Sequence, residues 1–205
     1  MERFLFVFTI FFMLLGPVKL IPSFGGLTRN VDLQFKRAVA IRGALVASAL
    51  CAIVALAGGT LLGKYRISLD AVRIAGGLVL LISALQVIFR KTESSSPSSD
   101  KPAAMQLAVS PVAVPMIVPY AGVAAILICM AHAPQYPGVT QSVAIALAAM
   151  MVLDFLVMYF IDQVVKTPGL AIILSVLGSV LVFVQAALAI NMMLVALRSL
   201  GVIQS

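Results

Sequence analysis

From Pro102 to Leu153 the chain contains no Asp, Glu, Lys or Arg. A soluble domain carries roughly one charged residue in four, whereas this sequence of 205 residues is 10% charged and 62% hydrophobic. Such a chain has too little polar surface to face water, so its solvent must be lipid. Lipid offers the backbone no hydrogen-bond partners, and long apolar runs satisfy that constraint as helices. The predicted fold class is an all-α membrane protein.

Six apolar runs are long enough to be predicted as transmembrane helices. They cover approximately residues 4–24, 43–63, 69–89, 103–131, 140–162 and 170–197. Ser68 or Asp70 is the expected N-cap of the third helix, and Arg73 is expected to pair with Asp70 at the membrane surface. A cleaved signal peptide is the alternative for the first run. It is disfavoured because residues 1–3 are barely positive and no cleavage motif of small residues follows.

Prolines interrupt two of these six runs. In the first run, Pro17 and Pro22 flank Lys19, and the fourth run contains three more prolines, Pro111, Pro115 and Pro119. Each proline removes a backbone donor and clashes with the preceding turn. Membranes tolerate broken backbone only where it packs inside protein or lines a cavity. We therefore expect spans one and four to be helices broken at prolines in the protein interior.

The two halves of the chain resemble each other at two places. Residues 16–22 parallel residues 110–115, and residues 84–88 parallel residues 189–193, which puts Gln86 and Asn191 at matched positions. Three spans per half is an odd number, so the second half would enter the membrane upside-down. The sequence thus predicts two inverted three-helix repeats, 1–91 and 103–205, joined by a flexible polar linker, 92–102. The alternative is a chance match of short proline motifs in sequence rich in Ala and Val.

Lys and Arg in the loops set the predicted orientation. With the N-terminus outside, eight of them fall in inside loops: Arg29, Lys36, Arg37, Arg42, Arg90, Lys91, Lys101 and Lys166. The outside stretches hold four, Arg3, Lys64, Arg66 and Arg198, or five if Arg73 is included. This excess predicts that both termini face the periplasm. The net charge of +7 is then a topology signal, and no nucleic-acid binding is predicted.

Three motifs carry a resemblance to the MarC family of bacterial inner-membrane proteins. They are Pro17…Pro22-x-Phe24…Leu27-Thr28, the run from Ile67 to Gly77, and Pro111-Val112-Ala113-Val114-Pro115. The resemblance covers nearly the whole chain. It implies a six-helix protein of the bacterial inner membrane, related to transporters of small neutral amino acids. The chain departs from the family pattern at Gly16, where Asp is usual, at Lys19-Leu20, where Gly-Asn is usual, and at the turn 119–122.

Two opposed broken helices suit a zwitterionic substrate, because helix N-termini attract a carboxylate and C-terminal carbonyls attract an ammonium. Lys19 and Asp154 are expected to pair or to face the same cavity. Alternatively, Lys19 reaches the inner interface and Asp154 bonds a neighbouring backbone. Structural hydrogen bonding is the alternative for Gln86 and Asn191. The predicted substrate-binding residues are Pro17, Lys19, Pro22, Gly76, Gly77, Gln86, Pro111, Pro115, Pro119, Asp154 and Asn191.

No cofactor, metal site or enzymatic constellation is predicted. His132 stands without a partner at metal-ligand spacing, and Cys51 and Cys129 are expected to be thiols buried in apolar runs. The predicted function is a secondary transporter that exports or exchanges small neutral amino acids or similar metabolites, coupled to a proton or sodium ion. The alternatives are a passive pore, or a membrane protein that transports nothing because Lys19 plugs the ancestral site.

Overall fold

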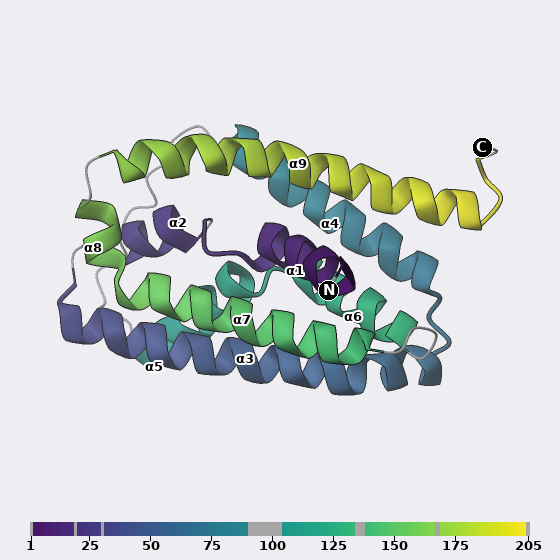
Figure 1. Cartoon of the computed structure of the whole chain (residues 1–205), viewed down its shortest axis with the longest axis horizontal. Helices are drawn as coiled ribbons and strands as arrows, with labels where there is room; N and C mark the ends of the chain where they lie inside the picture. The colour runs from purple at the N-terminus through teal and green to yellow at the C-terminus, as the bar shows by residue number, and fades with distance from the viewer. Residues whose placement is uncertain are drawn as a thin grey trace.

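The computed structural model describes residues 2–18, 20–29, 31–89, 104–133, 138–166 and 169–203, and its regular elements in these ranges are all helical (Figure 1). Four helices are long and apolar enough to cross a membrane: α3 (Leu33–Lys64), α4 (Leu69–Phe89), α7 (Val139–Tyr159) and α9 (Leu170–Ser199). The prediction of an all-α membrane protein is therefore confirmed.

The remaining elements are short. They are α1 (Glu2–Leu15), α2 (Leu20–Leu27), α5 (Ala104–Leu107), the kinked element η1 (Ala108–Ile117), α6 (Tyr120–His132) and α8 (Ile161–Lys166). At a rise of about 1.5 Å per residue, a helix the length of α1 or α6 falls short of a hydrocarbon core about 30 Å thick. In these two regions no single helix covers the predicted span.

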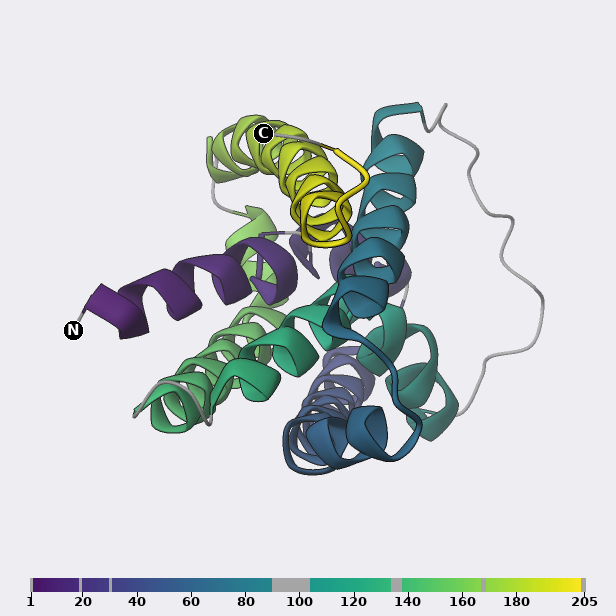
Figure 2. The same ribbon diagram turned by 90° about the vertical axis from the view of Figure 1, so that its right-hand side faces the viewer.

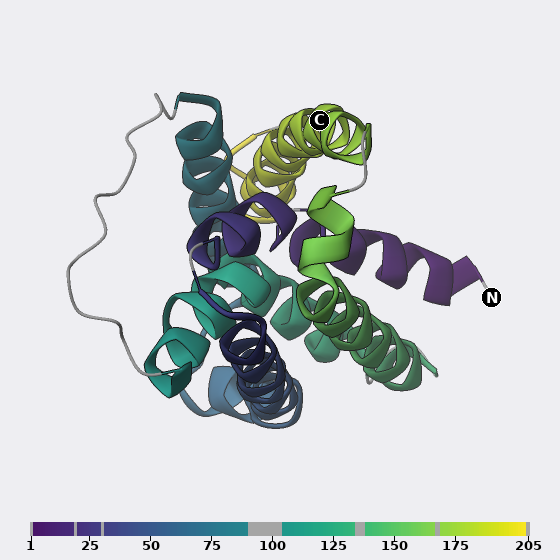
Figure 3. The ribbon, with the colours of Figure 1, turned by 90° about the vertical axis from the view of Figure 1, so that its left-hand side faces the viewer.

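The helices form three layers. The α4–α9 pair lies on one side, the α3–α7 pair lies on the other, and the short elements α1, α2, η1 and α6 fill the space between them (Figures 1 and 2). Helix α1 runs across the long helices, and its N-terminal end extends away from them (Figure 3). The layering places both proline-rich regions in the middle of the protein.

Helices α4 and α9 pack side by side in opposite directions. Asp70, in the first turn of α4, accepts a hydrogen bond of 2.9 Å from the hydroxyl of Ser199 at the end of α9. Asp70 also forms the predicted ion pair with Arg73, at 2.7 Å. The hydroxyl of Ser68 accepts a hydrogen bond from the Ala71 N–H at 3.1 Å, which confirms Ser68 as the N-cap.

The buried core surrounds the short elements of the middle layer. It draws side chains from the last turns of α1, from α2, η1 and α6, and from the inward faces of α3 and α7. Its largest fully buried side chains include Phe11, Leu15, Leu20, Phe24, Val39, Val112, Ile117, Ile126, Met150 and Met158. Burial of such side chains among closely packed neighbours fixes the positions of the two interrupted segments.

Candidate functional site

The first interrupted segment begins where α1 ends. The Gly16 N–H still donates to the Phe12 carbonyl at 3.0 Å, so the helical ladder extends one residue beyond α1. The next donor would be Pro17, which has no N–H. The side-chain amide of Gln185, on α9, instead donates to the Met13 carbonyl, with Nε2 2.6 Å from the oxygen. A distant helix therefore satisfies a carbonyl at the break.

The chain turns at Pro17 and re-enters a helix. The Pro17 carbonyl accepts hydrogen bonds from the N–H groups of Leu20 and Ile21 at 3.0 and 3.3 Å, and this begins α2. Gly16 and Pro17 are both buried. A Cβ built on Gly16 would overlap the Phe12 carbonyl oxygen, so this backbone accepts only glycine.

The second interrupted segment lies in η1. Ser110 and Val114 leave helical geometry and are extended, with φ near −139° and −133°. Each precedes a proline, and a proline disfavours the helical conformation in the residue before it. A new helix, α6, starts after Pro119, whose carbonyl accepts bonds from the N–H groups of Gly122 and Val123 at 2.8 and 3.2 Å.

The two interrupted segments lie against each other. A Cβ built on Gly122, in the first turn of α6, would come within 3.2 Å of the Leu15 side chain at the end of α1. Helix α2 also contacts η1, and α1 contacts α6. The predicted site prolines are thus gathered in the middle layer: Pro17 is buried, and Pro111 and Pro119 are half-buried. Pro22 lies in the first turn of α2 and Pro115 lies within η1.

Asp154 is completely buried in α7, among core residues that include Met150 and Met158. Helix α7 packs on α3, the helix that carries the buried Cys51. Helix α7 packs against both α1 and α3, so Asp154 belongs to the layer that faces the first interrupted segment. Lys19 is outside the residues that the structure describes, and its pairing with Asp154 stays a prediction.

Gly76 and Gly77 bring three helices together. A Cβ on Gly76 would lie 2.5 Å from the Ala124 Cβ of α6. On Gly77 it would lie 2.8 Å from both the Ala189 carbonyl oxygen and the Met193 Cγ of α9. Both glycines are buried. The two glycines therefore let α6 and α9 approach α4 closely.

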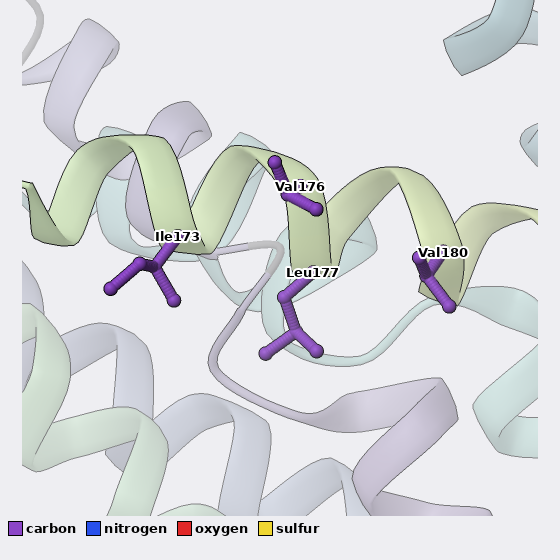
Figure 4. Close-up of a pocket in the computed structure, with 4 residues that line it drawn as sticks. All are labelled: Ile173, Val176, Leu177 and Val180. Atoms are coloured by element: carbon purple, nitrogen blue, oxygen red, sulfur yellow. The ribbon is translucent and has the colours of Figure 1, made fainter.

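Gln86 and Asn191 lie elsewhere. Both residues are exposed on the α4–α9 pair, outside the buried cluster. The structure thus separates these two amides from the interrupted segments. Helix α9 also has an apolar groove lined by Ile173, Val176, Leu177 and Val180, which follow helical spacing along one face (Figure 4). The groove is open and almost entirely apolar, so it offers little to orient a charged substrate.

Sequence reasoning missed two polar contacts. Gln185 is buried between apolar neighbours, and an amide at such a position is a recognisable signal in a membrane helix. Lys36 was assigned to an inside loop, but it is buried at the start of α3 and pairs with Asp162 of α8 at 2.6 Å. Beside it, the guanidinium of Arg37 lies 4.7 Å from the centre of the Tyr159 ring. These contacts tie α3 to α8 and to the end of α7.

Within the described ranges, no three His, Cys, Asp or Glu side chains come together in a way that could hold a metal ion. Cys51 and Cys129 are both free thiols. Cys51 is buried and Cys129 is half-buried. The arrangement brings together broken backbone, a buried carboxylate and close helix contacts in the interior of the protein.

The apolar helices and the interrupted segments between them define an integral, multi-pass α-helical membrane protein. The chain belongs to the MarC family, described as "MarC family integral membrane protein", which it matches over residues 1–200. This is not a known enzyme family.

The chain is similar to several distant membrane proteins whose names state no activity. It is 26% identical to UPF0056 membrane protein MJ1677 of Methanocaldococcus jannaschii, over 93% of this chain and 96% of that protein. It is 27% identical to UPF0056 inner membrane protein YhgN of Escherichia coli, over 66% of each chain. A UPF0056 membrane protein of Archaeoglobus fulgidus is 25% identical, over 71% of this chain and 68% of the relative. No solved structure matches.

Proposed function

We propose that the protein is a secondary transporter that exports or exchanges small neutral amino acids or similar metabolites. One observation carries this proposal: two proline-interrupted segments from opposite halves of the chain lie together in the interior, in contact at Leu15 and Gly122. Interrupted helices that meet inside a membrane protein are characteristic of transporter binding sites. The resemblance to transporters of small neutral amino acids supplies the substrate class.

The chemistry of the helix ends suits a zwitterion. Helices α2 and α6 begin at the interruptions, and their N-termini present positive dipole ends to a substrate carboxylate. The carbonyls at the end of α1 present the opposite sign to an ammonium group. Asp154 is our candidate for the group that binds the coupling ion, a proton or a sodium ion, because a buried carboxylate at membrane depth is costly without a role.

We also propose that the chain contains two inverted repeats of three spans, residues 1–91 and 103–205, joined by the linker 92–102. Spans one and four would be interrupted helices, α1 with α2 and η1 with α6. The packing supports this arrangement if α1 corresponds to η1, α2 to α6, and α3 to α7. The contact of α3 with η1 then has its counterpart in the contact of α7 with α1. The contact of α2 with η1 likewise has its counterpart in the contact of α6 with α1. The loop charges and the name of the E. coli relative support a bacterial inner membrane with both termini in the periplasm.

Transport by purified protein in liposomes tests the proposal. We expect labelled glycine, alanine or serine to accumulate against its gradient when a proton or sodium gradient is imposed. Asp154→Asn should abolish this accumulation, and the matched control Asp32→Asn, at an exposed acid whose side chain makes no cap bond, should retain it. Flux that only dissipates a gradient would support a passive pore. No flux with any small neutral amino acid would support a protein whose site is plugged by Lys19.

A further inference from the structure

The bond between Gln185 and Met13 replaces the hydrogen bond that Pro17 removes. In a continuous helix the N–H of residue 17 would donate to the carbonyl of residue 13. The Gly16 to Phe12 bond shows that the ladder is intact up to that point. The Gln185 Nε2 donates to the Met13 carbonyl oxygen at 2.6 Å, and this is the first carbonyl that loses its helical donor to Pro17. Gln185 is only 4% exposed.

We propose that Gln185 is a positioning residue that holds the broken end of α1 to α9. Its amide supplies the missing donor from a helix 172 residues away in the sequence. A carbonyl left without a donor in the interior is costly, so the bond fixes α9 at one place relative to the break. Helices α1 and α9 otherwise meet over a short stretch, which makes this bond the main polar link that we identify between them.

The matching residue of α4 does not make such a link. Under the 105-residue shift that relates α4 to α9, the position matching Gln185 is Leu80, which is buried and cannot donate. Helix α4 therefore offers the second interrupted segment no amide from this position. The first interrupted segment is thus held by a side chain from the opposite half of the chain.

This inference rests on the proposed function in one respect. If the α4–α9 pair moves relative to α1 during transport, the Gln185 amide must either carry the broken end of α1 with it or release the Met13 carbonyl. In both cases Gln185 acts through the backbone that positions the site and does not itself touch the substrate. Its replacement should lower the maximal rate of transport more than it changes the half-saturating substrate concentration.

The bond can be tested without transport. With carbonyl-13C Met and 15N Leu, only two peptide signals arise from Met–Leu pairs, Met13–Leu14 and Met193–Leu194. Gln185→Met, which keeps the length of the side chain and removes the donor, should shift the Met13 carbonyl signal upfield. The Met193 signal serves as an internal reference. The matched control Gln86→Met, at an exposed amide on α4, should leave the Met13 signal unchanged.

Restoring the backbone donor provides a rescue experiment. We expect Gln185→Met to lower the Tm by about 2–4 °C, and we expect the loss to be smaller in a Pro17→Ala background, where residue 17 has an N–H. If Gln185→Met does not fold, the wild-type protein still decides the matter through dipolar coupling between the Gln185 side-chain nitrogen and the Met13 carbonyl carbon.

Two outcomes would overturn the inference: an unshifted Met13 signal in Gln185→Met, or no dipolar coupling in the wild type. Loss of transport in every variant, with the Met13 signal behaving as expected, would instead count against the proposed function. The two failures are therefore distinguishable.

Discussion

Replacing Gly77 by alanine tests how closely α4 packs against α9. The added Cβ would lie 2.8 Å from the Ala189 carbonyl oxygen and 2.8 Å from the Met193 Cγ. The methionine side chain can rotate away, but the carbonyl is part of the α9 backbone and cannot. Ordinary contact begins at 3.4 Å, so α9 would have to move away by about 0.6 Å at this level.

The expected loss of stability follows from that displacement. A gap of about 0.5–1 Å removes roughly a quarter to a half of the dispersion energy of the contacts that open, and overpacking of a closed interface costs about 1–3 kcal/mol. The higher helix propensity of alanine offsets about 1 kcal/mol of this loss of stability. We therefore expect Gly77→Ala to lower the free energy of unfolding by up to about 2 kcal/mol.

Thermal unfolding in detergent, followed by circular dichroism, measures this difference. The control is Gly178→Ala in α9, where a Cβ would meet nothing within 4 Å, so only the gain in helix propensity applies. Gly77→Ala should lower the Tm by up to about 8 °C, and Gly178→Ala should leave it unchanged or raise it. If both substitutions raise the Tm equally, the close packing of α4 on α9 is wrong.

Three further predictions concern single contacts. Asp162→Asn should lower the free energy of unfolding by about 1–2 kcal/mol, because it leaves the buried Lys36 ammonium without its partner. The loss is limited because the Asp162 carboxylate is partly exposed. Recovery of stability in the charge-swapped protein, Lys36→Asp with Asp162→Lys, would support the pair. Ser68→Ala should cost about 1 kcal/mol by removing the acceptor of the Ala71 N–H, and Ser68→Asp should retain the stability. Gly16→Ala should cost about 2 kcal/mol or more, since its Cβ would overlap the Phe12 carbonyl, and wild-type stability in this variant would contradict the geometry of the break.

Helix class and several local contacts could be predicted because they depend on residues close in sequence. Apolar length predicted the four long helices, and the N-cap at Ser68 and the Asp70–Arg73 pair follow from spacings of three residues. The adjacent glycines 76 and 77 are a local pattern typical of close helix contact, and the structure has such a contact there. Each of these signals is local, so a single sequence is enough to find it.

The orientation of helix faces could not be predicted in the same way. A membrane helix is apolar toward lipid and also toward its neighbours, so its hydrophobic pattern does not show which side is inside. Gln86 and Asn191 were assigned to the site from their matched repeat positions, and they are exposed in the structure. The buried amide is Gln185, six residues before Asn191. Likewise, nothing near Lys36 in the sequence indicates that its partner is Asp162.

The contacts at Gly77 and Gln185 lie on the same helix, and this leads to a last prediction. Gly77 meets Ala189, one turn beyond Gln185 along α9. If α9 moves as a rigid unit, a displacement of about 0.6 Å at Gly77 also moves Gln185. The hydrogen bond from Gln185 to Met13 is 2.6 Å long, and the donor–acceptor distances of such bonds span only about 0.5 Å. Gly77→Ala should therefore shift the Met13 carbonyl signal in the same direction as Gln185→Met, but by less, and Gly178→Ala should not shift it. An unshifted signal in Gly77→Ala would mean that α9 bends between the two contacts and that the α4–α9 interface does not act on the break.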